Sequence, residues 1–253
     1  MRITMMTAKN KLIVALDVDS ADRALDLFGA LRDSVGMFKI GMQLFTTAGP
    51  DIVRQIVARG GRVFLDLKYH DIPNTVAAAG VEAARLGVSI FNVHTFGGAE
   101  MMRRTVDEVT ELSEREHLDR PMIIGVTVLT SVNQKVLSEV GVASSPDQQV
   151  PALAQLAAAS GLDGVVASPL EVVAVRAAIE KKDFLVVTPG VRPSGAAAHD
   201  QKRVTTPAEA IRAGSDYLVV GRPVIEAADP VAAANSIVAE IEVALRANQA
   251  SAL

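Results

Sequence analysis

The chain has 253 residues, with 25 Lys and Arg against 29 Asp and Glu, a net charge of -4 and 49% hydrophobic residues. A chain of this length and apolar content can bury one large core, and an acidic balance without a long basic run argues against nucleic-acid binding. The sequence contains no cysteine, which excludes disulfides, thiolate catalysis and cysteine zinc sites.

The first ten residues lack the apolar core of a signal peptide, and no uninterrupted apolar run approaches the length of about 18 residues that a membrane span needs. We therefore expect a soluble, cytoplasmic protein with neither a nucleic-acid nor a membrane partner. Residues 1–10 are predicted to form a flexible terminus.

Short runs rich in Val, Ile and Leu alternate with longer segments of helical spacing. The eight runs cover residues 12–16, 37–40, 63–65, 89–93, 123–128, 164–167, 184–187 and 217–220. Continuous apolar runs indicate strands buried on both faces, as in a parallel sheet. Ala-rich stretches at 152–159 and 231–245 are predicted outer helices.

The number and order of these runs decide between two α/β architectures. An open doubly wound sheet usually carries a Gly-rich dinucleotide loop, and this chain has no such loop. No composition break or long linker divides the chain. We therefore predict a TIM (β/α)8 barrel that forms a single domain over residues 1–253.

A cluster of alternating charges follows the third apolar run, in the segment FLDLKYHDIPNT at residues 64–75. Asp66 and Lys68 are two residues apart, a spacing that points both side chains to one face of a strand. Asp71 follows, and Pro73 suits the first turn of a helix. Ion-paired charges that cost desolvation energy indicate chemistry more than stability.

Polar side chains also lie at the ends of the other predicted strands, where the active sites of such barrels are found. They are Asp17, Lys39, His94, Thr127, Thr130, Arg192 and Arg222. A polar residue can end a strand simply because the strand emerges into water, which remains an alternative for any single position. As a set, two lysines and two aspartates on neighbouring strands favour convergence on one mouth of the barrel.

Two loops offer groups that suit a phosphate. The segment TPGVRP at 188–193 follows the seventh predicted strand and VGRP at 220–223 follows the eighth, so each supplies a glycine and an arginine, Arg192 or Arg222. Barrels frequently bind phosphate at these two loops. The glycines could instead serve only as turn residues and the arginines as surface residues.

Taken together, these residues resemble the orotidine 5'-phosphate decarboxylase family over most of the chain. The matching segments are VALD at 14–17, FKIG at 38–41, residues 64–75, NVH at 92–94, VTVLTS at 126–131, residues 188–193, Asp200 and Gln201 with Arg203, and residues 220–223. The Asp-x-Lys-x-x-Asp core alone is shared by a wider superfamily, so the ordered combination with both phosphate loops carries the resemblance.

The resemblance implies decarboxylation of orotidine 5'-phosphate to UMP and CO2 in pyrimidine biosynthesis, without a cofactor or metal. It implies that Lys68 protonates C6 of the pyrimidine, in a charge network with Asp66, Asp71 and Lys39. It also implies a homodimer in which Asp71, Ile72 and Thr75 reach the neighbouring site. The implied substrate-binding residues are Asp17, Lys39, Ile72, Thr75, Thr130, Pro189, Arg192, Gln201, Gly221 and Arg222.

Residues 193–203 are predicted to form a lid, in which Ser194 and His199 depart from the family pattern. Two other functions remain open. One is a Mg2+-dependent sugar-phosphate decarboxylase or aldolase of the same superfamily, which shares the Asp-x-Lys-x-x-Asp spacing. The other is a non-catalytic barrel that binds a nucleotide.

Overall fold

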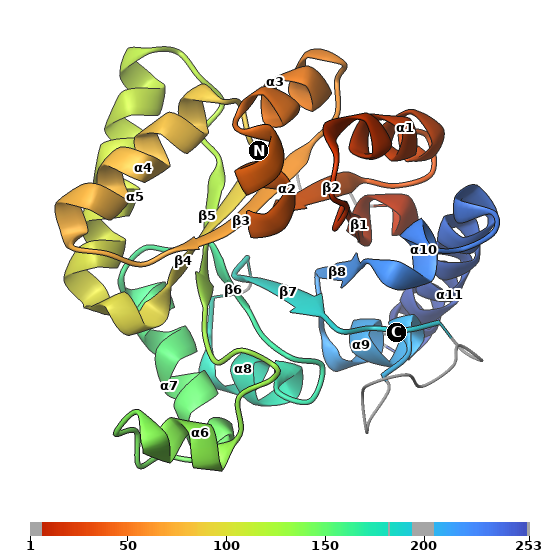
Figure 1. Ribbon diagram of the computed structural model, residues 1–253. Helices are drawn as coiled ribbons and strands as arrows, with labels where there is room; N and C mark the ends of the chain where they lie inside the picture. Colours follow the sequence, from red (N-terminus) through yellow and green to blue (C-terminus); the bar gives the residue numbers. More distant parts are fainter. Residues whose placement is uncertain (1–6, 182, 194–204, 252–253) are drawn as a thin grey trace. The chain divides into compact units, whose positions relative to one another are not determined.

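The computed structural model describes residues 7–181, 183–193 and 205–251. Eight parallel strands follow chain order in a closed barrel, and helices occupy the segments between them (Figure 1). The strands are β1 (Leu12–Ala15), β2 (Met37–Gly41), β3 (Val63–Tyr69), β4 (Ile90–His94), β5 (Met122–Val126), β6 (Gly164–Val166), β7 (Leu185–Pro189) and β8 (Tyr217–Val220). The predicted (β/α)8 fold and the eight predicted strand positions are confirmed.

Local sequence signals mark the ends of some of the helices. They are α1 (Ala21–Leu31), α2 (Met42–Ala48), α3 (Asp51–Ala58), α4 (Pro73–Arg85), α5 (Gly98–Arg115), α6 (Gln134–Glu139), α7 (Pro146–Ala159), α8 (Val172–Ala178), α9 (Pro207–Ala213), α10 (Arg222–Ile225) and α11 (Pro230–Ser251). Helix α9, for example, starts with a capping box of Thr206 and Glu209 and ends at Gly214 in the left-handed conformation. None of the helices in the described ranges combines the length and apolarity needed to cross a membrane.

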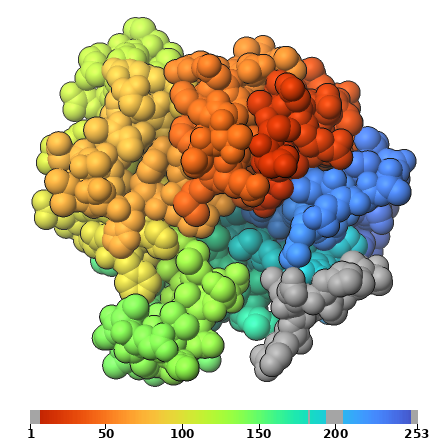
Figure 2. Space-filling model, in the orientation of Figure 1, coloured from red at the N-terminus to blue at the C-terminus, as the bar shows by residue number. Residues whose placement is uncertain are grey.

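By its internal contacts the chain divides into two compact units, residues 1–64 with 188–253 and residues 65–187. In the first unit β1 pairs with β2 on one side and β8 on the other, and all four residues of β1 are buried. Helix α11 packs on α1 and α9 in this unit. Figure 2 shows the N-terminal (red) and C-terminal (blue) residues side by side on one face.

In the second unit strands β4, β5, β6 and β7 form a parallel ladder in register. His94 pairs with Val126, Val126 with Val166, and Val166 with Val187, so the carboxyl ends of these strands lie at one level. Helices α4 and α5 lie side by side along this unit (Figure 1). Because parallel strands leave their carboxyl ends at one edge, the polar residues that follow them gather there.

The structure differs from the predicted flexible terminus at residues 8–10. Residues Ala8–Lys11 form a 3-10 helix, η1, that leads directly into β1. The backbone of Asn10 packs against Gly36, and the Nζ of Lys11 donates a hydrogen bond to the carbonyl of Asp216 at 3.2 Å. These contacts hold the segment before β1 against the unit to which it belongs.

Candidate active site

The first unit contains a pocket of about 670 Å³ at the carboxyl ends of β1, β2 and β8. This volume is in the range of small-molecule sites. The pocket collects six of the predicted substrate-binding residues: Asp17, Lys39, Pro189, Arg192, Gly221 and Arg222. It is completed by Ala15, Gly190, Val191, Val219, Pro223, Glu226 and Ala227.

An ion pair joins two of these residues. Lys39 lies on β2 with only 8% of its surface exposed, and its Nζ donates a hydrogen bond to Oδ1 of Asp17 at 2.9 Å. A Cβ at Gly41 would lie 2.9 Å from the Nζ of Lys39. The absence of a side chain at Gly41 therefore leaves room for the ammonium group that contacts Asp17.

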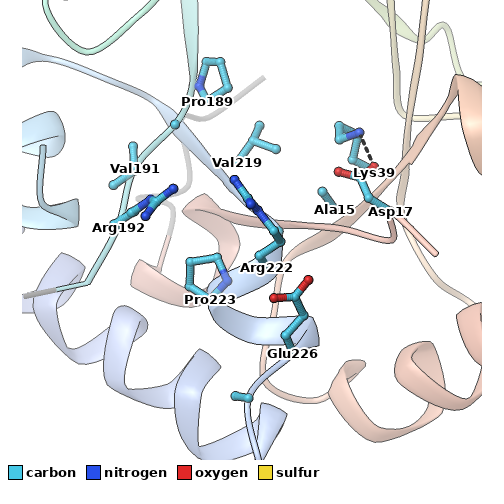
Figure 3. Close-up of a pocket in the computed structure, with 13 residues that line it drawn as sticks. Ala15, Asp17, Lys39, Pro189, Val191, Arg192, Val219, Arg222, Pro223 and Glu226 are labelled. Atoms are coloured by element: carbon cyan, nitrogen blue, oxygen red, sulfur yellow. Dashed lines mark hydrogen bonds and ion pairs between the residues drawn. The ribbon is translucent and has the colours of Figure 1, made fainter. Parts of the chain in front are cut away.

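The two arginines enter the pocket from different elements. Figure 3 shows Arg192, from the loop after β7, and Arg222, at the start of α10, with their guanidinium groups directed into the same space. Gly190 has a φ of +77°, which glycine adopts without strain. The N–H of Arg192 donates to the carbonyl of Thr205 at 3.1 Å. Two fixed guanidinium groups in one pocket suit a phosphate, which arginine binds through paired hydrogen bonds.

The second unit holds the predicted catalytic pair. On β3, Nζ of Lys68 donates to Oδ1 of Asp66 at 2.6 Å, and the two side chains are only 24% and 13% exposed. Asn92 on β4 joins the pair, because its Nδ2 donates to the same Asp66 oxygen at 2.7 Å. Its Oδ1 accepts the backbone N–H of Lys68 at 2.8 Å. An ammonium group is thus held beside a carboxylate in a largely buried setting.

A pair of histidine rings adjoins this cluster. The rings of His70 and His94 lie with centroids 5.4 Å apart. Burial lowers the pKa of His94, and electrostatic interactions with His70 and Lys68 lower it further, against a smaller opposing effect of Asp66. Burial also raises the pKa of Tyr69 to about 12. The neutral forms of His94 and Tyr69 are therefore favoured beside Lys68 at neutral pH.

The remaining predicted residues occupy exposed positions in the second unit. Asp71, Ile72 and Thr75 lie at the start of α4, where Oδ1 of Asp71 accepts the N–H of Ile72 at 2.6 Å. Pro73 begins this helix, as its position in the sequence predicts. Thr130 follows β5 and is exposed.

The structure leaves several other predictions about the site untested. Gln201 and most of the predicted lid at 193–203, with Ser194 and His199, lie outside the described residues. So do Asp200 and Arg203. The convergence of the Asp17–Lys39 pair and the Asp66–Lys68 pair on one mouth also stays a prediction. Among the described ranges, no three or more His, Cys, Asp or Glu side chains gather as metal ligands would.

The sequence-based assignment of site residues did not include Asn92, Gly41 or Glu226. Asn92 is 1% exposed, and a signal for it was present, since it is the one polar residue of the run Ile90–His94 before the terminal histidine. Gly41 belongs to a matching segment but has no side chain from which a role could be assigned. Glu226 faces the pocket from the residue after α10, and nothing in its spacing indicates this.

Comparison with known proteins decides the family. Residues 10–237 match the family described as Orotidine 5'-phosphate decarboxylase / HUMPS family. The chain belongs to this family. This match covers β1 to β8 and therefore includes both the pocket and the Asp66–Lys68 pair.

Curated members of the orotidine 5'-phosphate decarboxylase family match along nearly their whole length. Orotidine 5'-phosphate decarboxylase of Syntrophotalea carbinolica is 54% identical over 241 residues, which cover 95% of this chain and 98% of the relative. The protein of the same name from Trichlorobacter lovleyi is 56% identical over 236 residues, 92% of this chain and 96% of the relative.

Solved structures of similar proteins have the same fold. Orotidine 5'-phosphate decarboxylase from Lactobacillus acidophilus superposes with a TM-score of 0.81 at 38% identity, covering 91% of this chain and 98% of that one. An uncharacterized conserved protein from Geobacillus kaustophilus gives a TM-score of 0.79 at 35% identity, covering 91% and 99%. These similarities support the (β/α)8 architecture independently of the strand order.

Proposed function

We propose that this protein is a carbon–carbon lyase that decarboxylates orotidine 5'-phosphate to UMP and CO2 in pyrimidine biosynthesis, as a single catalytic domain in the cytoplasm. The proposal is supported by relatives of that name at more than 50% identity. The observation that supports it most directly is the Lys68–Asp66 ion pair at 2.6 Å, because it holds an ammonium group, which can act as a proton donor, in a largely buried setting.

The phosphate group of the substrate is assigned to the pocket of the first unit. Arg192 and Arg222 supply the charge-assisted hydrogen bonds, with Gly221 and Pro189 as further contacts. Gln201, which lies outside the described residues, is assigned to the same phosphate group. In the same pocket the paired Asp17 and Lys39 are assigned to the ribose hydroxyls. Thr130 is assigned to the pyrimidine. Binding of a remote phosphate can provide energy that is used at the reacting carbon.

Lys68 is proposed as the catalytic acid. The bond between C6 and the carboxylate breaks, CO2 leaves, and the electron pair of that bond stays on C6. The ammonium of Lys68 stabilises this charge and then donates a proton, so that a C6–H bond forms and Lys68 becomes a neutral amine that solvent reprotonates. Asp66 keeps the ammonium in place and lies near the departing carboxylate. Lys39 and Asp71 extend the alternating charges.

The proposed dimer accounts for residues at the start of α4. Asp71, Ile72 and Thr75 are assigned to the site of the neighbouring subunit. Ile72 is 65% exposed, so its side chain is accessible to a neighbouring subunit. The partners of the proposed enzyme are thus orotidine 5'-phosphate, UMP and a second copy of the chain.

The chemistry assigned to Lys68 needs no cofactor, and this separates the proposal from the Mg2+-dependent sugar-phosphate alternative. The purified protein is incubated with orotidine 5'-phosphate in the presence of EDTA, and the absorbance of the substrate is followed. We expect the absorbance to disappear at the same rate with and without EDTA. Activity on sugar phosphates that requires Mg2+, with no turnover of orotidine 5'-phosphate, would instead support the alternative.

The role of Lys68 is tested by Lys68→Ala. We expect kcat to fall by at least about 10⁴-fold, because both a proton donor and a stabilising charge are removed. Binding of UMP, measured by calorimetry, should remain largely intact. Lys135→Ala is the control, since Lys135 is 85% exposed on α6 and its loss should leave kcat unchanged. Persisting turnover in Lys68→Ala refutes the assignment, and UMP binding by a wild-type protein without turnover would indicate the non-catalytic barrel.

A further inference from the structure

The side-chain amide of Asn92 forms one hydrogen bond with Lys68 and one with Asp66, the two residues of the catalytic pair. It lies in the middle of β4 and is 1% exposed. Its Oδ1 accepts the backbone N–H of Lys68 at 2.8 Å, and its Nδ2 donates to Oδ1 of Asp66 at 2.7 Å. Asparagine supplies an acceptor and donors on one rigid plane, so the two bonds fix two groups relative to each other.

The bond to the backbone matters because Lys68 has an unfavourable conformation. Its φ is +54°, in the left-handed region that is unfavourable for a non-glycine residue. Such conformations persist when the surroundings hold them, and they concentrate at functional sites. A buried amide that accepts the N–H of Lys68 is a contact of this kind. It acts on the residue whose ammonium group reaches Asp66.

The hydrogen bond from Asn92 to Asp66 matters after Lys68 has transferred its proton. Oδ1 of Asp66 accepts hydrogen bonds from both Lys68 Nζ, at 2.6 Å, and Asn92 Nδ2. Once Lys68 has given its proton to C6, the charge attraction between Lys68 and Asp66 is lost. The bond from Asn92 does not depend on the charge of Lys68, so it holds the carboxylate in place until Lys68 is reprotonated.

We infer that Asn92 is a positioning residue for the reaction, which holds the backbone of Lys68 and the carboxylate of Asp66 in the arrangement that proton transfer requires. This inference rests on the proposed function of Lys68. Asn92 acts through the pair and not on the substrate. Its removal should therefore lower kcat with little effect on KM.

The first test compares Asn92→Ala with Thr95→Val. Thr95 is fully buried, follows β4, and donates a hydrogen bond to the carbonyl of Val126 at 2.8 Å, so its loss also removes a buried polar contact in this unit. We expect kcat of Asn92→Ala to fall by about 10- to 100-fold, while KM and the affinity for UMP change by less than about 3-fold. Thr95→Val should retain kcat even if its melting temperature falls.

The second test uses Asn92→Asp, which nearly preserves the shape of the side chain. The introduced carboxyl still accepts the N–H of Lys68, but it donates to Asp66 only when protonated. The kcat of this variant relative to wild type should therefore rise as the pH is lowered. A ratio that does not change with pH would count against the hydrogen bond from Asn92 Nδ2 to Asp66. This variant also decides the question if Asn92→Ala fails to fold.

A third readout does not require turnover. The 15N resonance of the Lys68 ammonium, assigned by its loss in Lys68→Ala, should move in Asn92→Ala towards that of an exposed lysine and stay in place in Thr95→Val. If the wild type lacks decarboxylase activity but this displacement is seen, the proposed function fails while the positioning by Asn92 stands. An unchanged resonance with kcat within about 2-fold of wild type overturns the inference. Equal losses of kcat in Asn92→Ala and Thr95→Val also overturn it, as does loss of UMP binding in Asn92→Ala.

Discussion

Arg222 and Arg192 occupy one pocket but differ in how the chain presents them. Arg222 begins α10, directly after Gly221. Arg192 lies in the loop after β7, where its own backbone N–H donates a hydrogen bond to the carbonyl of Thr205. Both side chains are at least partly accessible. Because ion pairs in contact with solvent contribute little to stability, we expect the loss of either arginine to be seen mainly in the binding of an anion.

We predict that Arg222→Ala lowers kcat/KM for orotidine 5'-phosphate by about 10- to 150-fold, the equivalent of about 1.5–3 kcal/mol for hydrogen bonds to a charged group. Steady-state kinetics measure this change. Orotidine, which lacks the phosphate, is the control substrate, and the variant should turn it over as slowly as wild type does. An equal loss with both substrates would show that Arg222 does not act on the phosphate.

At the scale of elements, the crossing of α4 and α5 depends on a glycine. A Cβ at Gly80 of α4 would lie 3.0 Å from Phe91 Cζ on β4 and 3.1 Å from Thr105 and Val109 on α5. These distances are tighter than ordinary van der Waals contact, so the helix lies close to both neighbours because position 80 has no side chain. The start of α4, which carries Asp71, Ile72 and Thr75, depends on this packing for its place in the second unit.

We predict that Gly80→Leu lowers the free energy of unfolding by about 1–3 kcal/mol, because the added side chain overpacks the crossing. Urea denaturation measures the change. Gly29→Ala is the matched control in α1, where a Cβ would meet nothing within 4 Å. It should raise the free energy of unfolding by about 0.5–1 kcal/mol through helix propensity. Unchanged stability in Gly80→Leu would mean that α4 can shift on its neighbours at little cost.

At the scale of the whole molecule, the proposed dimer would cover Ile72, the exposed apolar residue before α4. Ile72 is 65% exposed, and Val173 on α8 is 63% exposed, yet only Ile72 adjoins residues assigned to the neighbouring site. The two positions therefore form a matched pair for testing assembly. Exposure alone makes no distinction between them.

We predict that the wild type sediments at about twice 26.6 kDa, the mass of one chain. Ile72→Glu should raise the dissociation constant of the dimer by about 30-fold or more, because it removes an apolar anchor of the interface. Activity should fall in parallel at low protein concentration, because Asp71 and Thr75 no longer reach the partner. Val173→Glu should remain dimeric and active. A fully active wild-type monomer would contradict the assignment of Asp71, Ile72 and Thr75 to the neighbouring site.

The positions of the strands and the identity of the charged pair could be predicted from the chain. Apolar runs bounded by polar residues placed all eight strands, and the two-residue spacing placed Asp66 and Lys68 together, as the 2.6 Å bond confirms. The spacing argument that predicted this contact was incomplete, however. Strict alternation along a strand assumes extended backbone, and Lys68 has a φ of +54°. Sequence spacing carries no information on such a local departure.

The sequence by itself determined the family, the order of strands and helices, and the residue types at the ends of the strands, since these follow from periodicity and from the order of short motifs along the chain. Only the tertiary structure decided which residues touch across segments: Asn92 with Asp66 and Lys68, and Glu226 with the other residues that line the pocket. The physical reason is that a hydrogen bond between neighbouring strands depends on register and on the side-chain rotamer. Neither can be read from a single strand.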